Sequence, residues 1–314
     1  MTIAFVFPGQ GAQYVGMGRQ LAEAYPEARE AFDTASTVLG VDLRRLCWEG
    51  PDEVLRQTEH TQPAILTASI AALNTVRSRI PAPTLTAGLS LGEYTALVFA
   101  GAVAFPDTVR VVQQRGQFMA EAAKGVQTAM AALMGLDGPA VERVCEEARG
   151  RGVVEPANFN SPGQVVIGGE AAAVDHAIEL AKAAGAKRAV KLAVSAPFHT
   201  SLMRPVADRF AGVLGKVTIQ DSGIPVVSNV TARPVSQAEE IRRLLIAQVA
   251  SPVRWEQSVR AMGERGITTF VEIGPGTTLS GLIKKTIPGA HTLHVEDQAS
   301  LEETMRSLEQ VGTR

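Results

Sequence analysis

The stretch TAGLSLGEYTAL, residues Thr86 to Leu97, contains a Gly-x-Ser-x-Gly run in which Ser90 lies between Gly88 and Gly92. In a nucleophile turn a strand ends, the chain turns sharply and a helix begins at once, so the serine oxygen projects from a strained corner. The glycines let the two segments cross closely. Small and β-branched residues precede the turn and an apolar segment without alternation follows it, which predicts strand, turn and buried helix. A glycine-rich turn without chemistry is the alternative, because Gly and Ser are common.

The composition is that of a globular chain. Its 314 residues are 46% hydrophobic and 20% charged, enough for one large core or for a large and a small domain. A formal net charge of -2 gives no sign of binding to nucleic acid or to an anionic membrane surface. The start, MTIAFVFPGQG, does not resemble a signal peptide, and no apolar run reaches membrane-spanning length. We therefore expect a cytoplasmic protein.

The two cysteines give no sign of a disulfide framework or of a metal site. Cys47 and Cys145 could form at most one disulfide, and their spacing is not that of metal ligands. We expect both to be reduced core residues and expect no metal.

Before the nucleophile turn, the pattern predicts one strand followed mostly by helices. Ile3 to Phe7 is a short apolar run stopped by Pro8 and Gly9, typical of a buried strand that enters a glycine-rich loop, here PGQGAQ. Residues 14–78 have a mostly helical pattern, which PAP at residues 81–83 ends.

After the turn, Asp107 is expected to cap the helix TVRVVQQRGQFMAEA. Arg115 lies at the edge of the apolar face, where an arginine commonly lays its stem on the core and points its head to water. The apolar face itself consists of Val109, Val112, Gly116 and Met119.

Residues 128–195 have a different pattern, which predicts an inserted small domain. The order is strand, helix, two strands around NSPG, helix and strand, the β-α-β-β-α-β series of a ferredoxin-like unit. Cys145 falls on the apolar stripe of its first helix, and His176 lies off the stripe of its second, facing solvent. A large domain is then expected from residues 1–127 and 196–314. The last regular piece is expected to be the strand ITTFVEI, running into the turn and helix start GPGTTLSGLIKK.

A serine nucleophile needs a base, and His199 is the candidate among five histidines. It directly follows Pro197 and Phe198, a rigid and apolar pair of residues at the point where the chain re-enters the large domain. A half-buried histidine with only a structural part is the alternative. No acid between Ser90 and His199 occupies a convincing strand end, so we expect a Ser–His dyad with another orienting group; the acids considered are Asp107, Asp137 and Asp175.

An oxyanion hole needs two amide donors aimed at one point. The amide of Leu91, directly after the serine, is one natural choice. The second is expected from the loop formed by Gly9, Gln10 and Gly11, at the end of a neighbouring strand.

Seven motifs in order resemble one family along essentially the whole chain. They are GQGAQ, GLSLGEY, Arg115 in its helix, ANFNSPGQVVI at residues 157–167, APFHT, QVASPVRW at residues 248–255 and FVEIGPG at residues 270–276. Together they are similar to the malonyl-CoA:acyl carrier protein transacylases. The resemblance implies an α/β fold in which an α/β-hydrolase-like large domain carries an inserted ferredoxin-like small domain.

The same resemblance implies a ping-pong acyltransferase. Ser90 would take a malonyl group from malonyl-CoA and pass it to the phosphopantetheine thiol of an acyl carrier protein, in fatty-acid or polyketide synthesis. His199 would act as base and then as acid, oriented by the backbone carbonyl of Gln248. The amides of Gln10 and Leu91 would hold the oxyanion. Coenzyme A is part of the substrate, and no cofactor is implied.

Four further residues bear on the acyl group. By the resemblance, Arg115 pairs bidentately with the malonyl carboxylate and Asn160 contacts the acyl or pantetheine arm. Leu89 replaces a histidine that the family commonly has before the serine, which leaves the details of the pocket open. Phe198, directly before His199, is similar to the residue in malonyl-selective members of the family, so a malonyl group is expected rather than a methylmalonyl group.

Two other functions compete with this one. A hydrolase of the same architecture would clear acyl groups from carriers, although Arg115 would serve no purpose there; a non-catalytic carrier-docking module would not need Ser90 and His199. A monomer is the default expectation. An acidic carrier protein could dock on a basic segment, which could equally be a solvated face: Lys187, Arg188, Lys191, Lys284 and Lys285.

Overall fold

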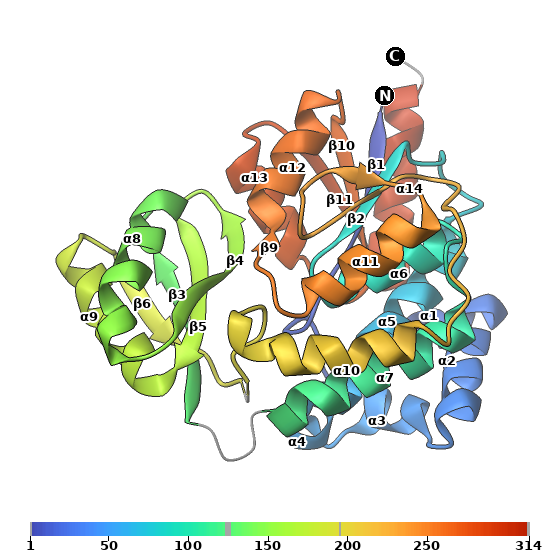
Figure 1. Ribbon diagram of the computed structural model, residues 1–314. Helices are drawn as coiled ribbons and strands as arrows, with labels where there is room; N and C mark the ends of the chain where they lie inside the picture. Colours follow the sequence, from blue (N-terminus) through green and yellow to red (C-terminus); the bar gives the residue numbers. More distant parts are fainter. Residues whose placement is uncertain (1, 123–126, 195, 313–314) are drawn as a thin grey trace.

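The computed structural model describes residues 2–122, 127–194 and 196–312 and contains two β-sheets, each with its own helices (Figure 1). A mixed, mainly parallel sheet belongs to the larger unit, and a second sheet with two helices forms the smaller unit. The predicted fold class, an α/β-hydrolase-like large domain with an inserted ferredoxin-like small domain, is confirmed. No helix among these residues is long and apolar enough to cross a membrane.

The larger sheet brings the ends of two strands to the same edge. All neighbouring strands are parallel except the antiparallel pair β7–β8, and Phe7 of β1 lies opposite Gly88 of β2. The loop that contains Gln10 and the turn that contains Ser90 therefore start side by side. The strand order is β11 (His291–Val295), β10 (Thr269–Ile273), β1 (Ile3–Phe7), β2 (Leu85–Gly88), β7 (Val226–Val227) and β8 (Pro234–Val235).

Helices cover both faces of this sheet because its strands are apolar on both sides. In β1, Phe5 and Phe7 pack into one buried cluster, and Ala4 and Val6 pack into another on the opposite face. Helices α12 (Trp255–Glu264) and α13 (Thr278–Thr286) contribute to the second cluster. The remaining helices of the larger unit are α1 (Arg19–Ala24), α2 (Pro26–Leu39), α3 (Leu43–Glu49), α4 (Asp52–Leu55), α5 (Thr58–Val76), α6 (Leu91–Phe99), α7 (Phe105–Ala122), α10 (Arg204–Leu214), α11 (Ala238–Gln248) and α14 (Gln298–Gly312).

Two local expectations are wrong. Helix α7 begins at Phe105 rather than after Asp107, because Pro106 fits the first turn of a helix; Asp107 lies within that turn and pairs with Arg110 at 3.3 Å. The strand ITTFVEI and the helix start after it, α13, are also not the last regular piece, since strand β11 and helix α14 follow. Strand β11, HTLHV, contains two histidines and lies at the sheet edge, so its sequence lacks the apolar run of a buried strand.

The smaller sheet has the strand order expected of a ferredoxin-like unit, with one addition. Strand β9 (Val253–Arg254) comes from beyond residue 195 and pairs in parallel with Asn158 and Phe159 of β4. The domain limits 1–127, 128–195 and 196–314 stay predictions, and residues 123–126 and 195 lie outside the described residues. The order is β6 (Arg188–Lys191), β3 (Thr128–Met134), β5 (Gln164–Glu170), β4 (Val154–Ser161) and β9, with helices α8 (Gly138–Ala148) and α9 (Ala171–Ala183).

The burial of the helix residues in the structure is largely as predicted. Cys47 and Cys145 are free and buried, and burial raises the pKa of both thiols. His176 is half-buried, with its Nδ1 atom 3.7 Å from Glu179. Burial is also as expected for Val109, Val112, Gly116 and Met119 of α7.

Replacing Gly92 with alanine is expected to lower the free energy of unfolding by about 1–3 kcal/mol, the usual cost of overpacking. A Cβ atom on Gly92 would overlap with the carbonyl oxygens of Phe7 and Pro8, so α6 would have to move away from β1. Urea unfolding measures the change. In the control variant Gly212→Ala, the added Cβ atom meets nothing within 4 Å, and stability should rise slightly because alanine favours the helix. An unchanged midpoint in Gly92→Ala would contradict this packing.

Candidate active site

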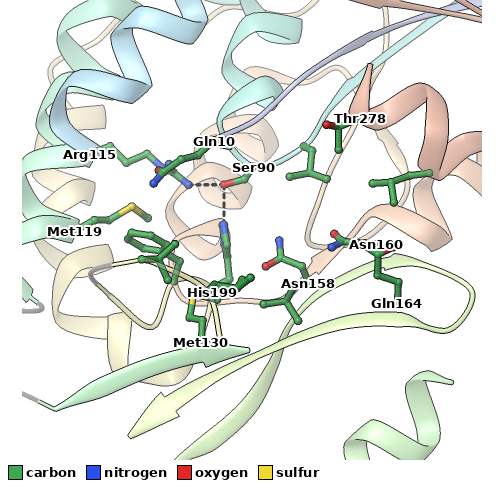
Figure 2. Close-up of a pocket in the computed structure, with 16 residues that line it drawn as sticks. Gln10, Ser90, Arg115, Met119, Met130, Asn158, Asn160, Gln164, His199 and Thr278 are labelled. Carbon is green, nitrogen blue, oxygen red and sulfur yellow. Dashed lines mark hydrogen bonds between the residues drawn. The ribbon is translucent and has the colours of Figure 1, made fainter. Parts of the chain in front are cut away.

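A cavity of about 240 Å³ lies between the two units and brings together most of the residues singled out in the sequence (Figure 2). Its wall on the small unit comes from strands β3, β4 and β5. Leu91 and Gln248 are fully buried behind the cavity rather than in its lining. The lining includes Gln10, Leu89, Ser90, Arg115, Asn160, Phe198 and His199, together with Met119, Met130, Asn158, Gln164, Val166, Leu192, Val194, Thr278 and Leu282.

Ser90 has the strained backbone of a nucleophile turn, with φ 52° and ψ -100° between the end of β2 and the start of α6. A Cβ atom on Gly88 would overlap with Gly92, so the crossing of the two segments requires glycine. Asn229, which follows β7, spans the turn: its Oδ1 accepts from the Ser90 amide at 2.6 Å and its Nδ2 donates to the Gly88 carbonyl at 2.7 Å. These two hydrogen bonds hold the serine in its unusual conformation.

His199 lies directly against the serine. Its Nε2 atom is 2.7 Å from Ser90 Oγ, and its Nδ1 atom is 2.9 Å from the backbone carbonyl oxygen of Gln248. A carbonyl can only accept, so Nδ1 carries the hydrogen and Nε2 presents its lone pair to the serine hydroxyl. Burial, followed by the nearby Arg115 charge, lowers the pKa of His199 to about 3. The imidazole is therefore neutral and can accept a proton from Ser90.

Arg115 is buried, with 2% of its surface exposed, and the expectation that its head points to water is wrong. Its guanidinium donates to Ser90 Oγ at 3.1 Å, to Gln248 Oε1 at 3.0 Å and to Gln62 Oε1 at 2.8 Å. Gly116 explains the burial, because a Cβ atom there would lie 2.7 Å from both Thr58 O and Glu59 Cα. The absence of that atom lets α7 approach α5 closely enough to enclose the arginine.

A buried carboxylate stands behind the serine. Glu93 is 3% exposed, and its Oε2 atom accepts from Gln248 Nε2 at 2.7 Å and from the Asn229 amide at 3.2 Å. Burial raises the pKa of Glu93 to about 7. Gln248 Nε2 also donates to the Ser90 carbonyl at 3.0 Å, so Gln248 connects the serine, the arginine and this carboxylate.

Sequence reasoning missed Gln62, Glu93, Asn158 and Asn229. A signal for the first two was present, since each is a polar residue within a helix whose neighbours are buried and apolar. Asn229 lies two residues past the end of strand β7, at the sheet edge where functional side chains gather. Asn158 belongs to the same NFNSPGQ region as Asn160 but gave no separate signal.

The predicted oxyanion donors lie on the two adjacent loops. Leu91 is the first residue of α6, where amides have no partner within the helix. A Cβ atom on Gly9 would overlap with the Leu89 carbonyl, so the loop that contains Gln10 presses against the nucleophile turn. Among the described residues, no group of three or more His, Cys, Asp or Glu side chains could hold a metal ion.

The rate of Ser90 acylation is expected to stay level as the pH falls through 6.5, the ordinary pKa of histidine, because burial keeps His199 neutral. A pH series of kcat/KM with the acyl donor measures this, and an acid limb centred near 6.5 would contradict it.

Between the folded pKa of about 3 and 6.5, the unfolded chain binds a proton at His199 that the folded chain excludes. The contribution of His199 to stability is therefore present above pH 6.5 and is lost as the pH falls.

A serine in a nucleophile turn, hydrogen-bonded to a neutral histidine at the end of a parallel strand, defines the class of enzymes that pass acyl groups through a serine ester. The acyl transferase domain family matches residues 4–310 of the chain. The chain therefore belongs to this acyltransferase family.

Individual relatives share nearly the whole length. The chain is 46% identical over 309 residues to a malonyl CoA-acyl carrier protein transacylase from Bacillus subtilis, covering 98% of each. It is 44% identical to the structure of an acyl carrier protein S-malonyltransferase from Vibrio cholerae, with a TM-score of 0.95, covering 97% of this chain and 100% of that one. It is 45% identical to a malonyl-transacylase solved in complex with a type II PKS acyl carrier protein, with a TM-score of 0.95, covering 98% and 100%.

Proposed function

We propose that this protein transfers a malonyl group from malonyl-CoA to the phosphopantetheine thiol of a holo acyl carrier protein. The observation that carries the proposal is the buried guanidinium of Arg115, 3.1 Å from the hydroxyl oxygen of Ser90. In a malonyl group the free carboxylate is separated from the thioester carbon by a single methylene. A cation that reads this carboxylate must therefore lie beside the nucleophile, as Arg115 does.

The acylation step follows from the Ser90–His199 pair. His199 Nε2 takes the proton as Ser90 Oγ attacks the thioester carbon, and the amides of Gln10 and Leu91 hold the oxyanion. When the C–S bond breaks, His199 returns the proton to the sulfur of coenzyme A. In the second half-reaction, His199 takes the proton of the carrier thiol as its sulfur attacks the acyl-serine carbon. The ester C–O bond then breaks, and His199 returns the proton to Ser90. Because donor and product are both thioesters, the reaction needs no cofactor or energy input.

Substrate binding also prepares the base. The guanidinium charge of Arg115 helps to lower the pKa of His199. A malonyl carboxylate paired with Arg115 offsets that charge, so the basicity of His199 rises when the correct substrate is present. Gln248 fixes both groups, His199 through its backbone carbonyl and Arg115 through its side-chain oxygen.

Two residues favour malonyl transfer over the alternatives. Arg115 selects a carboxylate, which a general acyl hydrolase would not require. Phe198 lines the cavity next to His199, where a large side chain leaves less room for the branch of a methylmalonyl group, and Leu89 also lines the cavity. Asn160 lies on β4 in the same cavity, where we propose that it contacts the acyl group or the pantetheine arm.

The carrier protein is proposed to dock on the exposed lysines of α13. Thr278 and Leu282 of this helix line the cavity, so Lys284 and Lys285 lie near its mouth. Reversing both charges with glutamate should raise the KM for the carrier severalfold and leave acylation by malonyl-CoA unchanged, as measured by transfer assays at varied carrier concentration. Lys191 is less available because its Nζ atom pairs with Asp175 at 2.6 Å. An unchanged KM for the carrier in the charge-reversed variant would contradict docking on α13.

We also propose that the enzyme acts in the cytoplasm as a monomer, without a metal. The direct test of its function is intact-mass measurement after incubation with malonyl-CoA, followed by holo carrier protein, with acetyl-CoA for comparison. A malonyl adduct that Ser90→Ala abolishes and that moves to the carrier faster than water removes it is the expected result. Loss mainly to water would instead indicate a hydrolase, and the absence of any adduct would contradict the acyl-serine mechanism.

A further inference from the structure

A directional chain of hydrogen bonds runs from Arg115 to Gln10. The guanidinium of Arg115 donates to Gln62 Oε1 at 2.8 Å, Gln62 Nε2 donates to Thr58 Oγ1 at 3.0 Å, and Thr58 Oγ1 donates to Gln10 Oε1 at 2.8 Å. An arginine can only donate, so Gln62 must present its oxygen to Arg115 and its amide nitrogen to Thr58. Arg115 therefore sets the direction of every bond in the chain.

The middle of this chain is enclosed by the protein. Gln62 is fully buried and Thr58 is 3% exposed, so water cannot replace a missing partner at either position. Both residues lie one turn apart on α5, on the face where Gly116 lets α7 approach. The side chains of Gln62 and Thr58, which connect Arg115 to Gln10, therefore cannot change their orientations independently of each other.

Gln10, at the far end, lies in a glycine-rich loop. It is flanked by two glycines, and Gly11 has a φ of 103° that other residues rarely adopt. Thr58 donates a hydrogen bond to the Gln10 side chain. Figure 2 shows the side chains of Gln10 and Arg115 reaching the same end of the cavity as Ser90. By holding the side chain of Gln10, Thr58 also restrains the backbone amide of that residue, which is the proposed oxyanion donor.

We propose that Thr58 and Gln62 are positioning residues that couple recognition of the acyl carboxylate at Arg115 to the oxyanion donor at Gln10. This inference rests on the proposed malonyl transfer. A carboxylate bound by Arg115 fixes the guanidinium, and the chain of hydrogen bonds then fixes Gln10 over the reacting carbonyl. An acyl group without a carboxylate leaves Arg115 with its contacts to the protein alone, so the oxyanion donor is held less tightly than with malonyl. Selection for malonyl is thereby made in the rate of acylation as well as in binding.

The test is single-turnover acylation of Ser90 by malonyl-CoA and by acetyl-CoA in the variant Thr58→Val, which removes the hydroxyl and keeps the shape. Loss of one buried hydrogen bond should slow malonyl acylation roughly tenfold with little change in half-saturating concentration. Acetyl acylation should change by less than about twofold, because it does not use the coupling. Thr58→Ser restores the donor and should return the malonyl rate to near its original value.

The double variant Thr58→Val with Arg115→Ala completes the design. Once Arg115 is absent, removal of the Thr58 hydroxyl should have almost no further effect on acetyl or malonyl acylation. Equal slowing of both donors by Thr58→Val, or an equally slow Thr58→Ser, would overturn the coupling and leave only a packing contribution. Unchanged malonyl acylation in Thr58→Val would overturn it as well. A malonyl adduct on Ser90 of the unaltered protein establishes the transfer separately, so failure of the coupling and failure of the function give different results.

Discussion

Replacing His199 with alanine is expected to slow acylation of Ser90 by roughly 10²- to 10⁴-fold, the usual contribution of a general base. The imidazole is 2.7 Å from the serine oxygen and is neutral at physiological pH, so it takes the proton as the thioester is attacked. Without it, the proton must leave to water in a buried site. The time course of malonyl adduct formation, followed by mass measurement at saturating malonyl-CoA, gives the rate constant.

Two controls separate loss of the base from loss of structure. Binding of malonyl-CoA, measured by calorimetry, should be largely retained, because Arg115 remains in place. Added imidazole should recover part of the rate, since the ring can occupy the space that the side chain leaves. Acylation within tenfold of the original rate would show that another group accepts the proton.

Arg115→Ala is expected to lower kcat/KM for malonyl-CoA by roughly 10²- to 10³-fold, as found when a buried partner of a charged group is removed. The substrate carboxylate would then enter a site without a cation and remain unpaired. Acetyl-CoA carries no such carboxylate, so its kcat/KM should stay unchanged or rise. Steady-state assays with both donors measure the ratio, and an unaltered ratio would contradict the assigned role.

Arg115→Lys is the matched control because it keeps the positive charge. A lysine cannot reproduce the planar fork that contacts Gln62, Gln248 and Ser90 together, so malonyl activity should stay well below that of the original protein. Arg115→Ala leaves the buried side-chain oxygens of Gln62 and Gln248 without their donor, and Arg115→Lys cannot serve both in the same geometry. Thermal unfolding should therefore be measured alongside, to separate a loss of stability from a loss of selectivity.

The turn around Ser90 could be predicted from the sequence because its requirements are local. A tight crossing of strand and helix needs small residues two positions before and two after the serine, and Gly88 and Gly92 supply them. His199 could be selected among five histidines because of its rigid apolar context. The backbone carbonyl of Gln248 as its orienting group came only from the family resemblance, since a carbonyl carries no side-chain signature.

The surroundings of Arg115 could not be predicted because they depend on contacts between distant segments. Periodicity places Arg115 at the edge of an apolar face, and nothing in α7 indicates that α5 closes over it. Its partners Gln62 and Gln248 are 53 and 133 residues away in sequence. Glu93 could not be predicted either, because its hydrogen bonds come from Asn229, in the turn after β7, and from Gln248, at the end of α11. Such networks are set by tertiary packing and leave no spacing pattern.

Strand β9 bears on whether the small unit could exist alone. Val253 and Arg254 complete the small sheet although they come from the segment that follows α11. A fragment cut at residues 128 and 195 would lose them and leave one side of β4 with unpaired backbone groups. Exposed strand edges recruit other chains, so the excised fragment should self-associate more readily than the intact protein. The small unit is therefore one continuous stretch of sequence, but its sheet is completed by residues from outside that stretch.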